Sequence, residues 1–220
     1  RFFRIGLSMG LYPDLLKHQE RCAAIADTGI AITYNELSTF SLRMAVAVKP
    51  HSLVFFFCEN TIGSLAGSVA FLNNGIVPLL LEAGQNQQNL GRLLDTYRPA
   101  YIYLPTWMRQ DYPEFKLVLT EYDCVLLHTN YENQIPLHEN LALLLTTSGS
   151  TGSPKLVRLS LENLKANGES IIDYLGIRTE ERAISTLPMH YSYGFSIINS
   201  HLLAGATLLL TRYTLVEKGF

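Results

Sequence analysis

One segment, residues 146–155 with the sequence TTSGSTGSPK, limits what this chain can be more than any other part of it. The segment is rich in hydroxyl side chains and glycine, lies between two apolar stretches, and ends with Pro154 and Lys155. A loop of small residues can bring many backbone N–H groups and hydroxyls close to phosphate oxygens without steric obstruction. Glycine permits the backbone angles that such a loop needs, and a neighbouring lysine supplies positive charge. We interpret residues 146–155 as a phosphate-binding loop.

The residues that we expect to contact or shape the bound phosphates are Thr146, Thr147, Ser148, Gly149, Ser150, Thr151, Gly152 and Lys155. The alternative is an ordinary solvated turn, since short Ser/Thr/Gly clusters are often nothing more. Two other motifs do not fit the sequence. A Walker loop ends in Gly-Lys-Ser/Thr, whereas Pro154 precedes Lys155 here. The nucleophile elbow of hydrolases would need glycine in place of Ser148, so Ser150 is not predicted to be a nucleophile.

The same ten residues resemble the signature of the adenylate-forming superfamily, which includes acyl-CoA synthetases, luciferases and the adenylation domains of nonribosomal peptide synthetases. Three weaker similarities surround it in the order expected for that superfamily. They are ITYNEL at 32–37, FLNNGIVPLLLE at 71–82 and LPMHYSYG at 187–194. Together these similarities extend over nearly the whole chain.

The resemblance implies a ligase that couples a carboxylic acid to ATP, giving acyl-AMP and pyrophosphate, and then passes the acyl group to a thiol. ATP and Mg²⁺ are the implied cofactors, and Lys155 is the implied catalytic residue. Three readings stay open: an acyl-CoA synthetase, an enzyme that loads a carrier-protein thiol, and a non-catalytic module that binds nucleotide or protein. The intact 146–155 segment counts against the third, because a non-catalytic descendant has no need of the lysine and every hydroxyl.

The LPMHYSYG segment is expected to lie at the substrate pocket, through His190, Tyr191 and Gly194. In the superfamily this element is spelled L-P-x-x-H-x-x-G, and its histidine position corresponds to Tyr191, with His190 one residue early. A tyrosine supplies a flat wall and a hydroxyl, but it does not titrate near neutral pH as histidine does. The alternative for this segment is an aromatic loop packed against the core.

Composition predicts a well-packed globular protein, because 48% of the 220 residues are apolar and 16% are charged. A net charge of −2 gives no reason to expect a nucleic-acid partner. Cys22, Cys58 and Cys124 are odd in number and widely spaced, which favours buried free thiols and a reducing cytoplasm. No apolar run approaches the length of a membrane span, and the spacing of the histidines predicts no metal site.

Apolar runs alternate with amphipathic segments, which predicts an α/β fold with doubly wound, mostly parallel sheets and flanking helices. We expect helices at 13–21, 34–48, 65–73, 86–97, 161–175 and 195–203. We expect strands at 22–27, 30–33, 52–58, 76–81, 100–104, 116–119, 124–128, 184–187 and 206–211, besides those that flank the phosphate loop. Capping residues are expected at Thr33, with Glu36 completing a capping box, and at Ser160.

A boundary is expected near residue 138, with a first α/β subdomain at 1–138 and the start of a second at 139–220. The resemblance implies further motifs for adenine, ribose and magnesium and a C-terminal lid domain, which this sequence does not contain. We therefore expect the 220 residues to be part of a longer enzyme and to be inactive alone. A truncated chain should also leave an apolar face uncovered near residues 195–210, which self-association or a partner would bury.

Overall fold

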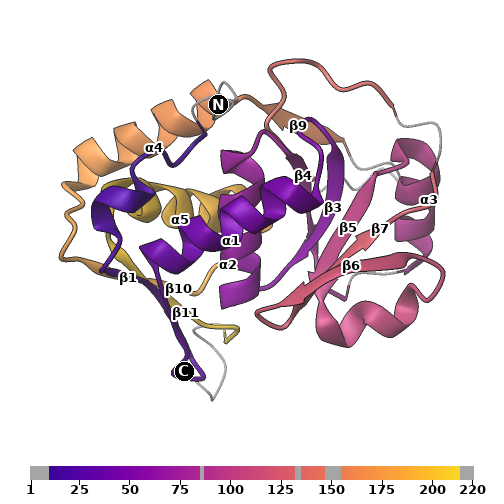
Figure 1. The fold of residues 1–220 in the computed structure, drawn as a ribbon. Coiled ribbons are helices and arrows are strands. Elements are labelled where there is room, and N and C mark those ends of the chain that lie inside the picture. Colours follow the sequence, from indigo (N-terminus) through magenta and orange to yellow (C-terminus); the bar gives the residue numbers. More distant parts are fainter. Residues whose placement is uncertain (1–9, 85–86, 132–134, 147–154, 214–220) are drawn as a thin grey trace, which may run out of the picture.

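The computed structural model describes residues 10–84, 87–131, 135–146 and 155–213. Within these residues the strands form two sheets (Figure 1). The larger sheet has seven strands in the order β6-β7-β5-β3-β4-β8-β9. Their bounds are β3 Leu53–Cys58, β4 Val77–Glu82, β5 Tyr101–Pro105, β6 Lys116–Glu121, β7 Cys124–His128, β8 Leu143–Thr146 and β9 Leu156–Leu159.

The middle of the larger sheet is parallel and both its margins are antiparallel. Strand β3 pairs in parallel with β4 and β5, and β4 pairs in parallel with β8. At one margin β7 pairs antiparallel with β5 and β6, and at the other β9 pairs antiparallel with β8. The expected class, an α/β fold with a mostly parallel sheet, is confirmed.

The smaller sheet has four strands in the order β10-β11-β1-β2 and joins the two ends of the described chain. Strands β1 (Cys22–Ala26) and β2 (Ala31–Thr33), both expected from the sequence, form an antiparallel hairpin. Strand β1 also pairs in parallel with β11 (Thr207–Leu210), which pairs in parallel with β10 (Arg182–Ser185). The division of the chain at residue 138 therefore does not coincide with the division between sheets, because β8 and β9 follow it and still join the larger sheet. The subdomain boundary itself stays a prediction.

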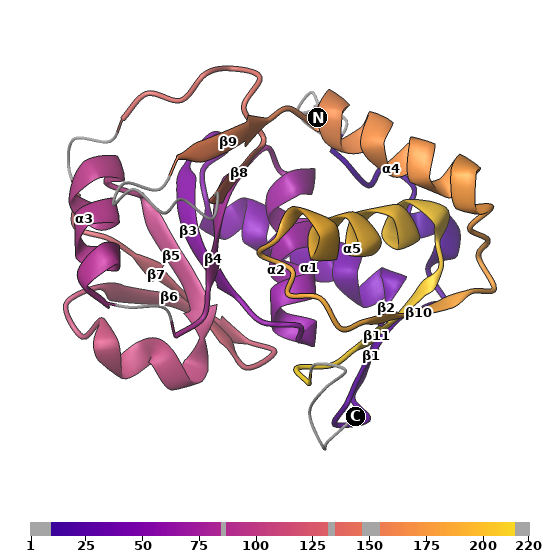
Figure 2. The same ribbon diagram turned by 180° about the vertical axis from the view of Figure 1, so that it is seen from behind.

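Helices fill the space between the sheets and cover the outer side of the larger one (Figures 1 and 2). Helix α2 (Ile62–Asn73) contacts β4 and β5 of the larger sheet and β1 of the smaller, and α1 (Tyr34–Ala47) packs beside it. Helix α5 (Ser192–Ala204) contacts β10, β11 and α4 (Leu161–Leu175), while α3 (Gln87–Tyr97) lies on the far side of the larger sheet. Since α2 lies between two sheets, nearly all of its residues are buried, as an all-round apolar helix requires.

Strand β3, expected at 52–58, is the centre of the hydrophobic core, because it is buried along its whole length. Side chains alternate between the faces of a strand, so successive residues of β3 enter different clusters. Phe56 faces α2 and packs edge-on against Phe71 and Tyr103, with ring centroids 5.6 Å and 5.3 Å away. Phe55 and Phe57 enter the cluster on the opposite face, which also contains Leu90 of α3.

Both predicted helix caps are present. The Thr33 hydroxyl accepts a hydrogen bond from the Glu36 amide, and the Glu36 carboxylate accepts one from the Thr33 amide. The Thr33 amide and the Thr33 hydroxyl both donate to the Glu36 carboxylate, and they lower its pKa because they stabilise the ionised form. Ser160 caps α4 in the same reciprocal way, with Asn163 as its partner. Gly176 ends α4 in the left-handed conformation, which glycine adopts without strain.

Several element boundaries differ from the sequence-based predictions. The expected helix at 13–21 is a short 3-10 helix, η1 (Leu15–His18), because β1 already begins at residue 22. A second 3-10 helix, η2 (Thr106–Asp111), was not predicted. Helix α2 starts at Ile62, since the Thr61 hydroxyl caps it by accepting from the Ser64 amide. Near the second motif, β10 begins at Arg182 and α5 at Ser192, so both elements start earlier than expected.

The three cysteines are free thiols, as expected, but only two of them are buried. Burial raises the pKa of the Cys124 thiol to about 12, so it stays protonated and unreactive at neutral pH. Cys58 is fully covered as well. Cys22 is half-buried, because it begins β1 at the end of the smaller sheet.

The stretch 195–210, where we expected an uncovered apolar face, is itself mostly covered, and Phe195, Leu202 and Leu208 are all buried. Exposed apolar side chains lie beside it instead, on the outer face of the smaller sheet. Ile184 and Tyr213, together with the partly buried Leu209, line a hollow of about 420 Å³ there. Self-association through this face stays a prediction.

Candidate functional site

The predicted phosphate loop connects two paired strands at the margin of the larger sheet. Strands β8 and β9 form an antiparallel pair in which Thr146 lies opposite Leu156. Thr146 is half-buried at the end of β8, and Lys155 is exposed immediately before β9. The two ends of the loop, Thr146 and Lys155, are therefore held near each other by the pairing of β8 with β9. The candidate residues between them, Thr147, Ser148, Gly149, Ser150, Thr151 and Gly152, lie outside the described residues.

Thr146 is at the carboxyl end of a strand that runs parallel to β4, and therefore also to β3 and β5. Open α/β sheets bind ligands in the crevice outside these carboxyl ends. The location agrees with the phosphate-binding interpretation. Both strands that flank the loop come from apolar stretches, but only β8 is buried. Val157 and Arg158 of β9 are exposed, because β9 is the edge strand and has a neighbour on one side only.

The second motif forms the connection from β10 to α5. His190 is buried with 6% of its surface exposed, whereas Tyr191 is 50% exposed and precedes the first residue of α5. The two rings are in contact, with centroids 4.3 Å apart. Burial lowers the pKa of His190, and the nearby Glu82 carboxylate partly opposes this shift. The imidazole therefore stays neutral down to a lower pH than an exposed histidine would.

Gly194 allows the loop to fold tightly against the first turn of α5. A Cβ atom at this position would lie 2.2 Å from the Pro188 carbonyl oxygen and 2.7 Å from that of Leu187. Those atoms are backbone and cannot rotate away as a flexible side chain could. The Tyr191 amide also donates to the Pro188 carbonyl at 3.1 Å, which closes the turn. Gly194 therefore shapes the loop, and it does so through backbone contact.

We expect Gly194→Ala to lower stability and to displace the loop, because the added methyl group has no space. Forced overpacking of this kind costs about 1–3 kcal/mol. Urea unfolding would measure the loss. Gly91→Ala is a matched control in α3, because nothing lies within 4 Å of a Cβ atom placed there. Equal stabilities of the two variants would contradict the predicted clash.

The two motifs meet at one cavity of about 570 Å³ between the β8–β9 pair and helices α4 and α5. Figure 2 shows α4 and α5 side by side, beyond the margin of the sheet that β8 and β9 form. Thr146 from the first motif and Tyr191 from the second both line the cavity. The remaining lining residues are Leu145, Val157, Leu159, Asn163, Leu164, Asn167, Ser192, Phe195, Ser196 and Asn199. The wall formed by described residues carries no charged side chain and combines apolar groups with hydroxyls and amides.

His190 and Gly194, which we expected to line a substrate pocket, are not among the residues that line this cavity. His190 is covered beneath the exposed Tyr191, and Gly194 faces the backbone of its own loop. A role for either in contacting substrate stays a prediction. Of the three pocket candidates, Tyr191 is the one whose side chain reaches the cavity shared with Thr146.

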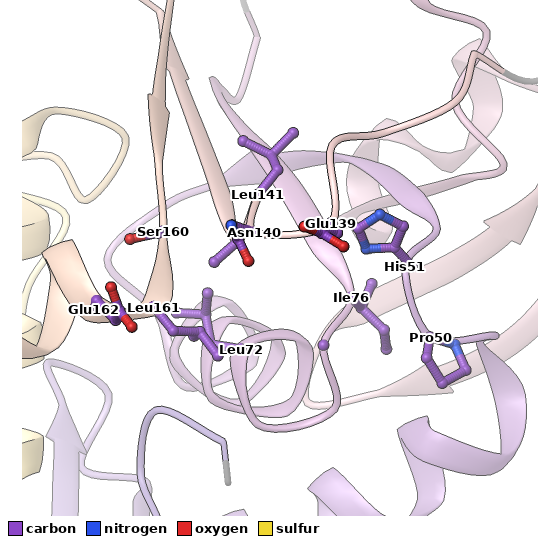
Figure 3. Close-up of a pocket in the computed structure, with 12 residues that line it drawn as sticks. Pro50, His51, Leu72, Ile76, Glu139, Asn140, Leu141, Ser160, Leu161 and Glu162 are labelled. Atoms are coloured by element: carbon purple, nitrogen blue, oxygen red, sulfur yellow. The ribbon is translucent and has the colours of Figure 1, made fainter. Parts of the chain in front are cut away.

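A second cavity, of about 590 Å³, lies at the opposite end of the sheet (Figure 3). Its walls include Pro50 and His51 before β3, Ile76 before β4, and Ala142 before β8. These are the amino ends of the parallel strands, so this cavity is remote from the carboxyl ends where α/β sheets bind ligands. Figure 3 shows His51 beside Glu139, and the His51 ring is within hydrogen-bond distance, 3.2 Å, of the Leu137 carbonyl oxygen. We do not assign the candidate site to this cavity.

Sequence analysis missed two polar residues that follow buried strands at the carboxyl edge. Asn60 lies two residues after the end of β3 and contacts the second motif, and Glu82 is the last residue of β4, close enough to affect the pKa of His190. A polar residue at the carboxyl end of an apolar run was the signal that could have identified them. Among the residues that the structure describes, no three His, Cys, Asp or Glu side chains gather as a metal site would require. No helix of this part is both long and apolar enough to cross a membrane.

Comparison with known proteins decides the family. The model of the family described as AMP-binding enzyme matches residues 14–218. The chain belongs to this family. Among curated proteins, the AMP-binding chain is 24% identical over 205 residues to malformin synthetase mlfA of Aspergillus vadensis, covering 88% of this chain. It is 23% identical over 212 residues to nonribosomal peptide synthetase GRA1 of Gibberella zeae, covering 91% of this chain. It spans only 4% and 3%, respectively, of these much longer relatives.

Several solved structures share the fold. Apo MatB from Rhodopseudomonas palustris superposes with a TM-score of 0.76 at 20% identity, covering 93% of this chain and 45% of that one. O-succinylbenzoate Coenzyme A synthetase (MenE) from Bacillus subtilis, in complex with AMP, gives 0.73 at 20% identity, covering 92% and 55%. ATP-bound MatB gives a TM-score of 0.76 at 21% identity, covering 93% and 45%. The AMP-binding chain thus spans about half the length of these structural neighbours.

Proposed function

We propose that this protein activates a carboxylic acid with ATP, forming an acyl-adenylate and pyrophosphate, and then transfers the acyl group to the thiol of CoA. The observation that carries the proposal is the TTSGSTGSPK segment, which follows the buried strand β8 at the carboxyl edge of the sheet. That position suits a nucleotide phosphate, and membership of the AMP-binding family supports ATP as its source. The identity of the acid is left open.

The chemical difficulty of the first step is negative charge on both reactants. The carboxylate must approach the α-phosphorus while negative charge builds up on the departing pyrophosphate. Donors and cations directed at the β- and γ-phosphates lower this barrier. Lys155 is the proposed cation, and the hydroxyls of Thr147, Ser148, Ser150 and Thr151 are the proposed donors.

Thr146 and Lys155 fit this role in the part of the loop that the structure describes. Thr146 lines the cavity that Tyr191 also lines, and Lys155 is exposed next to the loop. A hydroxyl and an ammonium are both donors, which phosphate oxygens require. Mg²⁺ would enter with ATP and offset its charge. The described residues do not gather into a metal site, so we assign no ligand for Mg²⁺ to them.

The cavity that Thr146 and Tyr191 share is the proposed location of the acyl substrate. Its described walls are neutral, which suits the uncharged part of an organic acid better than a second charged group. We propose Tyr191 as a wall of this pocket, with His190 and Gly194 supporting the loop that carries it.

Transfer to a carrier-protein thiol is the second candidate, and the curated relatives favour it. Several of them are named as peptide synthetases, such as GRA1 of Gibberella zeae. The structural neighbour MenE is named as a Coenzyme A synthetase. The two candidates share the adenylation step and differ only in the thiol that accepts the acyl group.

Carboxylate-dependent ATP–pyrophosphate exchange by the full-length protein tests the adenylation step. We expect exchange to require both ATP and one member of a panel of aliphatic, aromatic and amino acids. Thioester formation should then be followed with CoA and, separately, with a phosphopantetheinylated carrier protein. Absence of exchange with every acid, while ATP still binds, would favour the non-catalytic reading and contradict the proposal.

A further inference from the structure

A single side chain, Asn60, joins the carboxyl edge of the larger sheet to the loop that carries His190 and Tyr191. Its amide nitrogen donates to the carbonyl oxygens of Ser185 and Leu187, at 2.9 Å and 3.0 Å. Its amide oxygen accepts from the Met189 N–H at 3.1 Å. These partners are 125 to 129 residues away in sequence. The side chain is buried, with 8% of the surface of Asn60 exposed, so solvent competes little for these bonds.

The chemistry of the three bonds requires a carboxamide. Two of the partners are carbonyl oxygens and need donors, whereas the third is an N–H and needs an acceptor. Asparagine offers two donors and an acceptor on a short side chain. An aspartate of the same size would accept only, and would place a negative charge against two carbonyl oxygens. The site is thus specific for asparagine at position 60.

Asn60 lies between two buried elements, strand β3 and helix α2. It follows β3, every residue of which is buried, and precedes the first turn of α2, where the Thr61 hydroxyl caps the Ser64 amide. The same turn packs directly on its neighbours, because a Cβ atom at Gly63 would lie 2.2 Å from the Tyr122 carbonyl oxygen. On the other side of these hydrogen bonds, β10 ends at Ser185 and α5 begins at Ser192, so residues 186–191 belong to no helix or strand.

We propose that Asn60 is a positioning residue for the substrate pocket of the proposed ligase. By fixing the backbone at Ser185, Leu187 and Met189, its amide sets where the next residues, His190 and Tyr191, emerge. Tyr191 then lines the cavity that Thr146 also lines. Asn60 itself is absent from that cavity wall, so it acts through the loop and touches no substrate. The expected effect on the KM for the acid rests on the proposed function. The expected effect on the position of the loop does not.

The test compares Asn60→Ala with Asn74→Ala in the full-length protein. Asn74 is a matched control, because its amide also donates to carbonyl oxygens, those of Ser41 and Ala70. It caps the C-terminal end of α2, whereas Asn60 precedes the N-terminal end of that helix. Hydrogen–deuterium exchange of a peptide that contains Met189 is the structural readout. We expect faster exchange there in Asn60→Ala and unchanged exchange in Asn74→Ala.

The kinetic readout is ATP–pyrophosphate exchange at varied acid and ATP concentrations. Asn60→Ala should raise the KM for the acid by about tenfold, because the loop would no longer hold Tyr191 in the wall of the cavity where the acid is proposed to bind. The KM for ATP should change less than twofold, because the phosphate loop lies on the β8–β9 pair. Asn74→Ala should leave both constants unchanged. A merely structural role for Asn60 would alter both constants together or neither.

Unchanged exchange at Met189 in Asn60→Ala, or equal effects on the two KM values, would overturn the proposal. If Asn60→Ala does not fold, Asn60→Asp keeps the size of the side chain and the acceptor for the Met189 N–H but removes both donors. The two KM values are then the readout, with the same expected and contradicting results. If the unmodified protein shows no exchange with any acid, the proposed function fails. The deuterium exchange at Met189 then still decides whether Asn60 positions the loop.

Discussion

Replacing Lys155 by alanine should slow carboxylate-dependent ATP–pyrophosphate exchange by about tenfold to a hundredfold or more. A hydrogen bond to a charged group contributes about 1.5 to 3 kcal/mol, and each 1.36 kcal/mol of barrier is about tenfold in rate. The free energy of unfolding should barely change, because Lys155 is exposed and contributes little to the core. The side chain would act on charge that develops as pyrophosphate departs, so the loss should appear in the rate of adenylation.

Two further variants make this measurement specific to position 155. Lys155→Arg should restore activity only in part, because a planar guanidinium does not occupy the place of a compact ammonium. Lys165→Ala removes another exposed lysine, from α4, where its ammonium lies 3.8 Å from the Glu169 carboxylate, and should leave exchange unchanged. Equal rates for the unmodified protein and Lys155→Ala would remove Lys155 from the site and weaken the proposed function with it.

Phe56→Ala should cause the largest loss of stability, about 3–5 kcal/mol, the range typical of a buried phenylalanine. Phe56 is fully buried in the central strand β3, and its ring contacts those of Phe71 and Tyr103. Those two rings also contact each other, with centroids 5.4 Å apart. The two rings that remain cannot fill the space left by Phe56 unless α2, which carries Phe71, moves against the sheet. Urea unfolding followed by circular dichroism would measure the change.

Tyr174→Ala is the control for the Phe56 variant, since it also removes an aromatic ring but from a side chain that is 88% exposed on α4. We expect its effect to stay within about 0.5 kcal/mol, the usual range for surface substitutions. A loss of less than about 1 kcal/mol for Phe56→Ala would mean that the core is not organised around β3 as described. Comparable losses in both variants would lead to the same conclusion.

Local sequence signals determined the individual elements of this protein and the position of the phosphate motif. The capping box of Thr33 and Glu36, the cap at Ser160 and the left-handed Gly176 each depend on residues within a few positions of one another. Strand β3 was evident because a continuous apolar run of that length is typical of a strand buried on both faces. The sequence predicts such features because each depends on residues that are only a few positions apart in the chain.

The tertiary structure alone decided how distant segments meet. Nothing in the sequence of β1 indicated that it pairs with β11, or that β9 is an exposed edge strand. A backbone hydrogen bond can be satisfied by any strand, so strand order follows from which assembly buries the most apolar surface. The same holds for Tyr191 beside Thr146 and for Asn60 bound to residues 185–189, because a carboxamide pairs with any backbone that folding brings within reach.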